Sequence, residues 1–190
     1  MDSTAGQLVF VFVLIIINGY FAMAEIALIS VRRSALLAKA DEGSRGAQAA
    51  LSLTADPTIL LATIQIAITL VGMLASATAA VTLAQPVQVW LEQLGVDFIT
   101  PLAAGVSVFL VTLIISYFTL VLGELVPKRL GLQKAEAVAV FAAPSIRTIA
   151  TIFRPFVVLL TTSTRLVGKL FGVDANVSQE GVSEEEIKLL

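Results

Sequence analysis

Residues 123–128, Gly-Glu-Leu-Val-Pro-Lys, place a carboxylate, a proline and a cation directly after an apolar run from Ile99 to Leu122. If that run is a membrane helix, Pro127 has no backbone N–H to donate to the carbonyl oxygen of Gly123, four residues earlier. This oxygen and the Glu124 carboxylate then lie together near the end of a membrane span. Such groups are unfavourable at that depth unless a positive charge binds them. The stretch therefore predicts a cation site inside a membrane.

Other polar side chains are expected at a similar depth. Asn18 and Glu25, seven residues apart, share one helical face of an earlier apolar run. Gln65 and Thr69, four residues apart, share a face of the next run. At about 1.5 Å per residue, Glu25, Gln65, Thr69 and Glu124 fall at comparable heights in the inner half of the bilayer, where three helices can enclose an ion. The expected ligands are Glu124, Gly123, Glu25, Thr69, Gln65 and Asn18.

The same residues have plainer interpretations, and the sequence leaves both open. Glu124 could extend to the membrane surface or pair with Lys128. Glu25 could pair with Arg32 or Arg33 at the end of its run. The amide and hydroxyl side chains could simply hydrogen-bond between membrane helices.

Several neighbouring residues are expected to shape the site rather than to bind the ion. Pro127, Lys128 and Gly72 are assigned structural or gating roles. Four hydroxyl residues are expected to pack between helices or to bond their own helix backbone: Ser76, Thr112, Ser116 and Thr119.

Composition limits both the fold class and the kind of metal. Of the 190 residues, 57% are hydrophobic and 14% charged, whereas soluble domains average about 45–50% apolar and about 25% charged residues. The apolar residues gather in runs at roughly 7–31, 58–84 and 99–122, which predicts an all-α membrane protein with three transmembrane helices. Cysteine and histidine are absent, so a bound metal must have oxygen ligands, as Mg²⁺, Ca²⁺, Mn²⁺ or an alkali ion does.

The distribution of charge predicts the orientation. The first loop, residues 32–56, is basic; the second, residues 85–98, has no Lys or Arg; and the region after the third run is basic again. The positive-inside rule then places the N-terminus outside and the C-terminus in the cytoplasm, in the inner (plasma) membrane. A net charge of −2 gives no reason to expect a nucleic-acid partner.

Residues 135–172 have two interpretations. They are apolar enough for a fourth span, but two prolines and two arginines divide them into pieces of about ten residues, too short to cross. Arg147, Arg154 and Arg165 also share one helical face, which favours amphipathic helices lying along the inner membrane surface.

The chain is therefore expected to have three parts. Residues 1–134 form the three-span core, with two short helices joined by a turn at 41–44. Residues 135–172 form a juxtamembrane helical belt. Residues 173–190 form a linker and the start of a longer cytosolic region, because Ser183 and Glu186 match the capping box that opens a helix.

These motifs resemble the transmembrane domain of the CorC/CNNM (cyclin M) family, in the bacterial branch historically labelled hemolysin-like. The resemblance rests on Asn-Gly-Tyr-Phe at 18–21, Ala-Glu at 24–25, residues 65–69 and residues 123–128, and it covers nearly the whole chain. It implies a homodimer, a following CBS-domain pair through which ATP would bind, and Mg²⁺ export driven by Na⁺ entry. It also implies that Mg²⁺ is held among the three helices.

The chain departs from the better-known Mg²⁺ members of that family at a few positions. They often have Ser where this chain has Ala22, and Asn where it has Ile68, Thr69 and Gly72. Fewer strong ligands remain, and some wider relatives are linked to polyamine export. Three hypotheses follow: a Mg²⁺ exporter, an exporter of small organic cations, and a membrane anchor or sensor for a cytosolic part. No nucleophile with a base is apparent, so an enzyme is not expected.

Overall fold

The computed structural model describes residues 4–93 and 100–170, and every regular element in these two ranges is a helix. In chain order they are α1 (Thr4–Ser30), α2 (Arg33–Asp41), α3 (Arg45–Thr54), α4 (Pro57–Gln93), η1 (Thr100–Leu102), α5 (Ala103–Leu120), η2 (Val121–Leu125), α6 (Val126–Gln133) and α7 (Ala135–Leu170). This confirms the expected all-α class. Residues 94–98 of the expected loop at 85–98 and the capping box at 183–186 lie outside the described residues.

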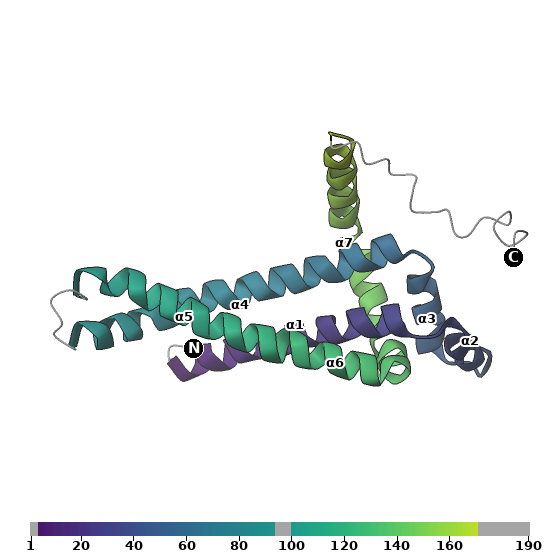
Figure 1. Ribbon diagram of the computed structural model, residues 1–190. Coiled ribbons are helices and arrows are strands. Elements are labelled where there is room, and N and C mark those ends of the chain that lie inside the picture. The colour runs from purple at the N-terminus through teal and green to yellow at the C-terminus, as the bar shows by residue number, and fades with distance from the viewer. Residues whose placement is uncertain (1–3, 94–99, 171–190) are drawn as a thin grey trace, which may run out of the picture.

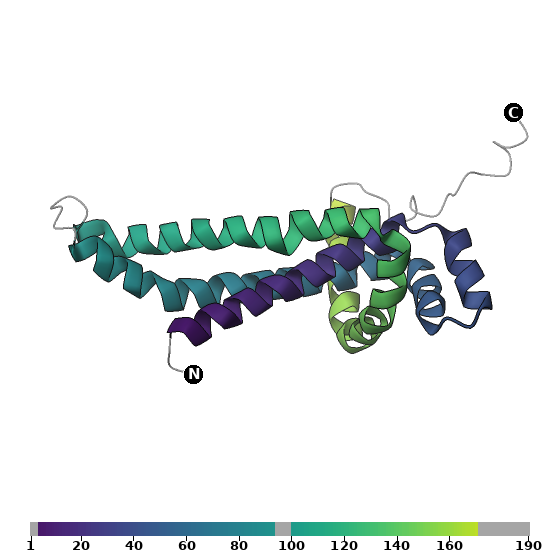
Figure 2. The same ribbon diagram turned by 90° about the horizontal axis from the view of Figure 1, so that it is seen from below.

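Three long rods form the body of the molecule: α1, α4, and the continuous run of α5, η2 and α6 (Figure 1). The short helices α2 and α3 gather at one end, together with α6 and the start of α7. Helix α7 runs across the rods rather than alongside them, and the view turned by 90° shows it nearly end-on (Figure 2). Four described helical segments are long and apolar enough to cross a membrane: 5–30, 57–93, 100–133 and 135–170.

The rods pack through small residues and expose large ones, as expected for helices surrounded by lipid. Ala24, Ala75 and Ala79 are fully buried, whereas Val81 is 81% exposed and Phe109 is 66% exposed. Small side chains let the helix backbones approach one another, and large apolar side chains on the outside meet an equally apolar solvent. These are features of a membrane protein.

The helical hairpin of α2 and α3 agrees with the sequence. Gly43 has φ +89°, the left-handed conformation that glycine adopts readily in a turn. The Ser44 hydroxyl oxygen then accepts a hydrogen bond from the Ala47 N–H at 3.2 Å and caps α3. Asp56 likewise accepts from the Ile59 N–H at 3.1 Å, so that Pro57 opens α4.

Helix α4 extends further than predicted. It continues to Gln93 with Pro86 inside it, so the expected loop at 85–98 is wrong for residues 85–93. Proline removes one backbone donor and disfavours a helix. However, Leu83 before Pro86 and Val87 after it both pack against the buried apolar cluster that includes Ala79, and Leu91 is buried as well. This packing continues the helix through the proline.

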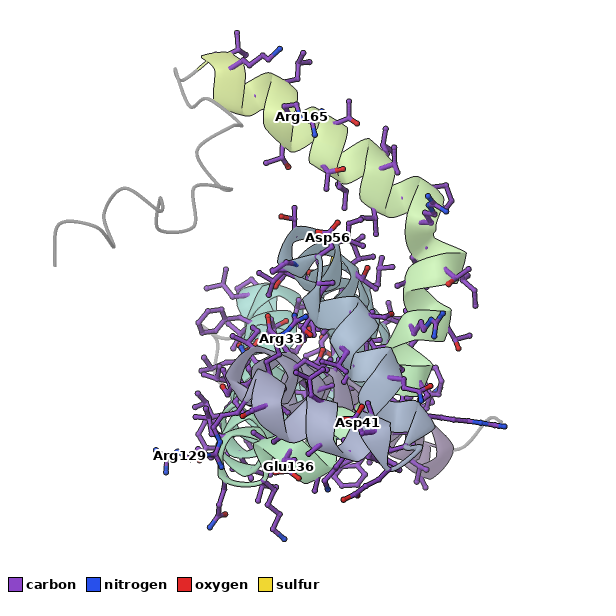
Figure 3. All side chains as sticks on the ribbon, turned by 90° about the vertical axis from the view of Figure 1, so that its right-hand side faces the viewer. Arg33, Asp41, Asp56, Arg129, Glu136 and Arg165 are labelled. Atoms are coloured by element: carbon purple, nitrogen blue, oxygen red, sulfur yellow. The ribbon has the colours of Figure 1, made fainter. Side chains whose placement is uncertain are left out.

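Helix α7 is one helix of 36 residues, not the separate short pieces that its prolines predicted. Pro144 leaves the Val140 carbonyl without its helical donor, and Gly46 of α3 packs directly against that oxygen, where any Cβ would collide. Contact with α3 therefore stabilises the interrupted turn. The helix bends along its length, and the part that carries Arg165 turns away from the bundle (Figure 3).

Candidate functional site

The turn Val121–Leu125 is a π-helix, a wider turn that is frequent at functional sites. It contains Gly123, whose carbonyl oxygen Pro127 cannot satisfy. The structure satisfies it from another helix: the Nδ2 atom of Asn18 donates to the Gly123 oxygen at 2.9 Å, in a buried position. The carbonyl that the sequence predicted to be without a donor from Pro127 is therefore present in η2, and its hydrogen-bond partner is the Asn18 amide of α1.

Two glycines make this contact between α1 and η2 close. A Cβ on Gly123 would lie 3.2 Å from the Ile15 carbonyl oxygen, and a Cβ on Gly19 would lie 2.9 Å from Cγ of Pro127. Both distances are shorter than ordinary contacts. Glycine at these positions is what brings the Asn18 amide within hydrogen-bonding distance of the carbonyl.

The two glutamates converge, and they do so on one lysine. The ammonium nitrogen of Lys128 lies 2.9 Å from Oε1 of Glu124 and 3.3 Å from Oε2 of Glu25. Glu25 belongs to α1 and Glu124 to η2, so side chains of separate helices meet at a single positive charge. The Glu25 side chain is 15% exposed and that of Glu124 is 39% exposed.

This geometry decides between the plainer interpretations of the sequence. Glu124 pairs with Lys128, as one of these interpretations predicted. The predicted ion pair of Glu25 with Arg32 or Arg33 is not formed, because Glu25 pairs with Lys128 as well.

A cavity of about 440 Å³ lies beside the ion pair. Glu124 lines it, together with apolar side chains of α4. Its other polar lining residues are Asn18, Thr69, Ser76 and Thr119, and Gly72 also borders it. Glu124 therefore belongs both to the cavity and to the ion pair, whereas Glu25 and Lys128 are not among the lining residues.

Two residues that line this cavity each have a buried side-chain oxygen without a hydrogen-bond partner among the described residues: Oδ1 of Asn18 and Oγ1 of Thr119. Buried oxygens normally have a partner, so such a pair points to a bound water or ligand. Two other threonines of α4 bond their own helix backbone: the Thr63 hydroxyl donates to the Ile59 carbonyl at 2.7 Å, and the Thr82 hydroxyl donates to the Thr78 carbonyl at 2.7 Å.

Sequence reasoning missed Thr119 and Ser76, which it assigned to packing or backbone bonding. Thr119 makes no such backbone bond within the described part of the chain, and both residues line the cavity. The signal that could have found Thr119 is its spacing of four residues from Gly123, which places the two on one helical face.

The polar residues of α4 are only partly brought together. Thr69 lines the cavity, and a Cβ on Gly72 would lie 3.7 Å from Oδ1 of Asn18. Gln65 does not line the cavity: its side chain is exposed and donates from Nε2 to the Thr69 hydroxyl at 3.3 Å. Gln65 therefore contacts the site only indirectly, through its hydrogen bond to Thr69.

The family assignment follows from comparison with known proteins. Residues 8–190 match the model of the cyclin M (CNNM) transmembrane N-terminal domain. The chain belongs to the CNNM family. This CNNM domain is 38% identical over 189 residues to the UPF0053 protein sll0260 of Synechocystis. The aligned residues cover 100% of the chain and 42% of that protein. Over 191 residues it is 32% identical to the UPF0053 protein YhdP of Bacillus subtilis, covering 97% of the chain and 41% of the relative.

A further relative is the UPF0053 inner membrane protein YfjD of Escherichia coli, 25% identical over 175 residues, which cover 92% of the chain and 37% of the relative. The chain thus spans about two fifths of the length of the curated relatives it matches.

The donor set of the CNNM domain limits how a metal could be held. Within residues 4–93 and 100–170, no group of three or more Asp, Glu, His or Cys side chains is arranged to bind a metal. A metal at this site would have two carboxylates at most, with neutral oxygens and water completing its ligands. Mg²⁺ suits such a set, because it typically uses one or two carboxylates and keeps several waters.

Proposed function

We propose that this CNNM domain exports Mg²⁺ from the cell, driven by Na⁺ entry, through the cavity beside Glu124. One observation supports this most directly. Carboxylates of two separate helices, Glu25 and Glu124, converge on one positive charge next to a cavity with unpartnered oxygens. One ammonium cannot balance two carboxylates, and in an apolar bundle the remaining negative charge favours a bound cation.

The dimensions of the cavity support a partly hydrated ion. The cavity has a volume of about 440 Å³ and is widely open on one side, and Mg²⁺ usually keeps several of its waters when it binds. The ion can therefore enter with water and exchange part of it for protein oxygens. Glu124 supplies the charge, Asn18, Thr69 and Thr119 supply neutral oxygens, and Glu25 acts from the far side of the ion pair.

The Gly123 carbonyl has a different role from the one the sequence suggested. One of its two lone pairs already accepts the Asn18 amide. It holds that amide so that Oδ1 of Asn18 is directed away from the bond, and it can contribute to the ion only through its second lone pair. Gly123 and Asn18 therefore act as a unit in the proposed site.

The orientation proposed for the domain is N-terminus outside and C-terminus in the cytoplasm, in the inner membrane. Charged residues of α2, α6 and α7, among them Arg33, Arg129 and Glu136, appear together in the view from one end (Figure 3). A basic end faces the cytoplasm under the positive-inside rule. Since α7 crosses the rods at this end, we assign it to the membrane surface as the belt.

The domain is proposed to work as a homodimer with a cytosolic part following α7, through which ATP would act. The exposed apolar side chains of α4 and α5, such as Met73 and Phe109 at 65% and 66% exposure, offer a lipid-facing or subunit-facing surface. A transport role, rather than an enzymatic one, is proposed for the membrane domain.

The direct test is Mg²⁺ efflux from proteoliposomes under an imposed Na⁺ gradient. We expect efflux by the wild-type protein and none above the leak by the double variant Glu25→Gln, Glu124→Gln. A surface double variant, Lys39→Gln with Glu136→Gln, removes another ion pair, at 2.9 Å, and serves as the matched control. Wild-type efflux by the Glu25, Glu124 variant would reject this function.

A second candidate is export of a small organic cation, and the structure offers one observation for it. The cation between the two carboxylates is a primary ammonium, that of Lys128. A diamine presents the same group. Thermal unfolding of the purified domain separates the candidates: Mg²⁺ alone raises the melting temperature under the first, and putrescine or cadaverine alone under the second.

A further inference from the structure

Lys128 occupies the position at which an incoming cation would be neutralised. Its ammonium contacts Glu124 at 2.9 Å and Glu25 at 3.3 Å, and these are its ion-pair partners among the described residues. Without a guest ion, two negative charges and one positive charge meet there. The site therefore already contains a cation of its own.

The same lysine is placed so that it can leave. Its side chain is 33% exposed, on the first turn of α6, and Glu124 rather than Lys128 borders the cavity. A lysine side chain is a compact charge on a flexible four-carbon stem. Its ammonium can move into water while the Glu124 carboxylate stays at the cavity.

The charges favour such an exchange. A divalent cation bound at Glu124, with Glu25 nearby, makes the local charge zero if Lys128 has left, and +1 if it remains, with two cations sharing the Glu124 carboxylate. Like charges within a few ångströms repel strongly in a partly buried site. The arriving ion and the ammonium are therefore alternative occupants.

We propose that Lys128 is a tethered competing cation, which pairs with Glu25 and Glu124 when the site has no ion and must leave Glu124 for a divalent cation to bind. This inference rests on the proposed function. It assigns Lys128 a role in setting affinity: the lysine weakens binding, so that a captured ion can be released, and it keeps the empty site from carrying two uncompensated charges.

Titration calorimetry of the detergent-purified protein with Mg²⁺ tests this. Lys128→Met should bind Mg²⁺ about tenfold more tightly than wild type, because a competing charge is gone. Lys128→Arg keeps the charge and should bind no more tightly than wild type. The matched control is Arg129→Met, which removes one positive charge from the next, exposed position and should change affinity less than about twofold.

The outcomes are distinguishable. Equal or weaker binding by Lys128→Met, or the same gain in Arg129→Met, overturns the inference and leaves the proposed function standing. Absence of Mg²⁺ binding by wild type and by all three variants overturns the proposed function, and this inference with it.

A measurement on the wild-type protein keeps the inference falsifiable if Lys128→Met does not fold. Lysine acylation by a water-soluble ester, followed by mass spectrometry, should be faster at Lys128 when Mg²⁺ is present, because the ammonium has left its carboxylates. Lys39, which is 40% exposed and paired with Glu136 at 2.9 Å, is the internal control and should not change. An unchanged or slower rate at Lys128 overturns the inference.

Discussion

The same three rods have two different interiors along their length. Toward the α4–α5 connection, Val11, Ile15, Ala79, Val111 and Ile115 form an apolar cluster in which each side chain is at least 92% buried. Directly beyond this cluster, beginning about one turn after Ile15, the space between the rods contains an amide, two glutamates, a lysine and a cavity. Packing alone holds the first region together, whereas the second depends on polar atoms that need partners.

The two regions also treat the helix backbone differently. In the apolar cluster the rods keep regular helical turns, and small residues bring them together. At the polar site the third rod widens into the π-turn η2 and exposes the Gly123 carbonyl to Asn18. Substitutions should therefore separate the two regions: those in the apolar cluster change stability, and those at the polar site change ion binding.

The largest effect is expected from Glu124→Gln. It removes the carboxylate that borders the cavity, and a charged ligand contributes about 1.5–3 kcal/mol, so the Mg²⁺ dissociation constant should rise about a hundredfold. The free energy of unfolding should change by less than about 1 kcal/mol, because the pair with Lys128 is partly exposed. Titration calorimetry measures the dissociation constant, and unfolding in detergent measures the free energy of unfolding. Glu136→Gln, at the surface pair with Lys39, should leave the affinity unchanged.

Asn18→Ala should affect both quantities. It leaves the buried Gly123 carbonyl without the amide donor and removes the Oδ1 atom at the cavity, so the free energy of unfolding should fall by about 1–3 kcal/mol. Mg²⁺ affinity should fall about tenfold. Asn18→Leu keeps nearly the same size but has neither the donor nor the acceptor. A fully stable Asn18→Leu protein would contradict the structural part of this role.

Ala79→Leu tests the apolar cluster. Ala79 is fully buried between the rods, and added methylene groups in a packed interior destabilise by about 1–3 kcal/mol. The melting temperature should fall while the Mg²⁺ dissociation constant stays within about twofold of wild type. Val81→Leu, at a position 81% exposed, is the control and should alter neither. Loss of ion affinity in Ala79→Leu would show that the two regions are coupled.

The smallest effect is expected from Thr119→Val, which removes a hydroxyl at nearly constant volume. Its Oγ1 is buried and unpartnered within the described structure, so stability should not decrease, and Mg²⁺ affinity should fall about threefold. Thr63→Val, which loses a hydroxyl bonded to the Ile59 carbonyl at 2.7 Å, is the comparison and should leave the affinity unchanged. An unchanged affinity in Thr119→Val would place that hydroxyl outside the site.

Much of the site could be predicted from residue types and spacing. Pro127 located the Gly123 carbonyl, counting along the apolar runs placed Glu25 and Glu124 near one level, and the seven-residue spacing put Asn18 on the same helical face as Glu25. Counting gives the height of a residue but not the rotation of its helix. Gln65, at the expected height, is therefore on the exposed side of α4, while Ser76 and Thr119 line the cavity.

The sequence by itself determined the membrane character, the long helices and the charged end of the molecule, because these depend on the number and order of apolar and charged residues. Tertiary structure alone decided that Glu25 and Glu124 share Lys128, and that Asn18 reaches the Gly123 carbonyl. Both contacts join residues of different helices. They depend on the π-turn, which interrupts the 3.6-residue period used to assign helical faces, and on the close approach at Gly19 and Gly123.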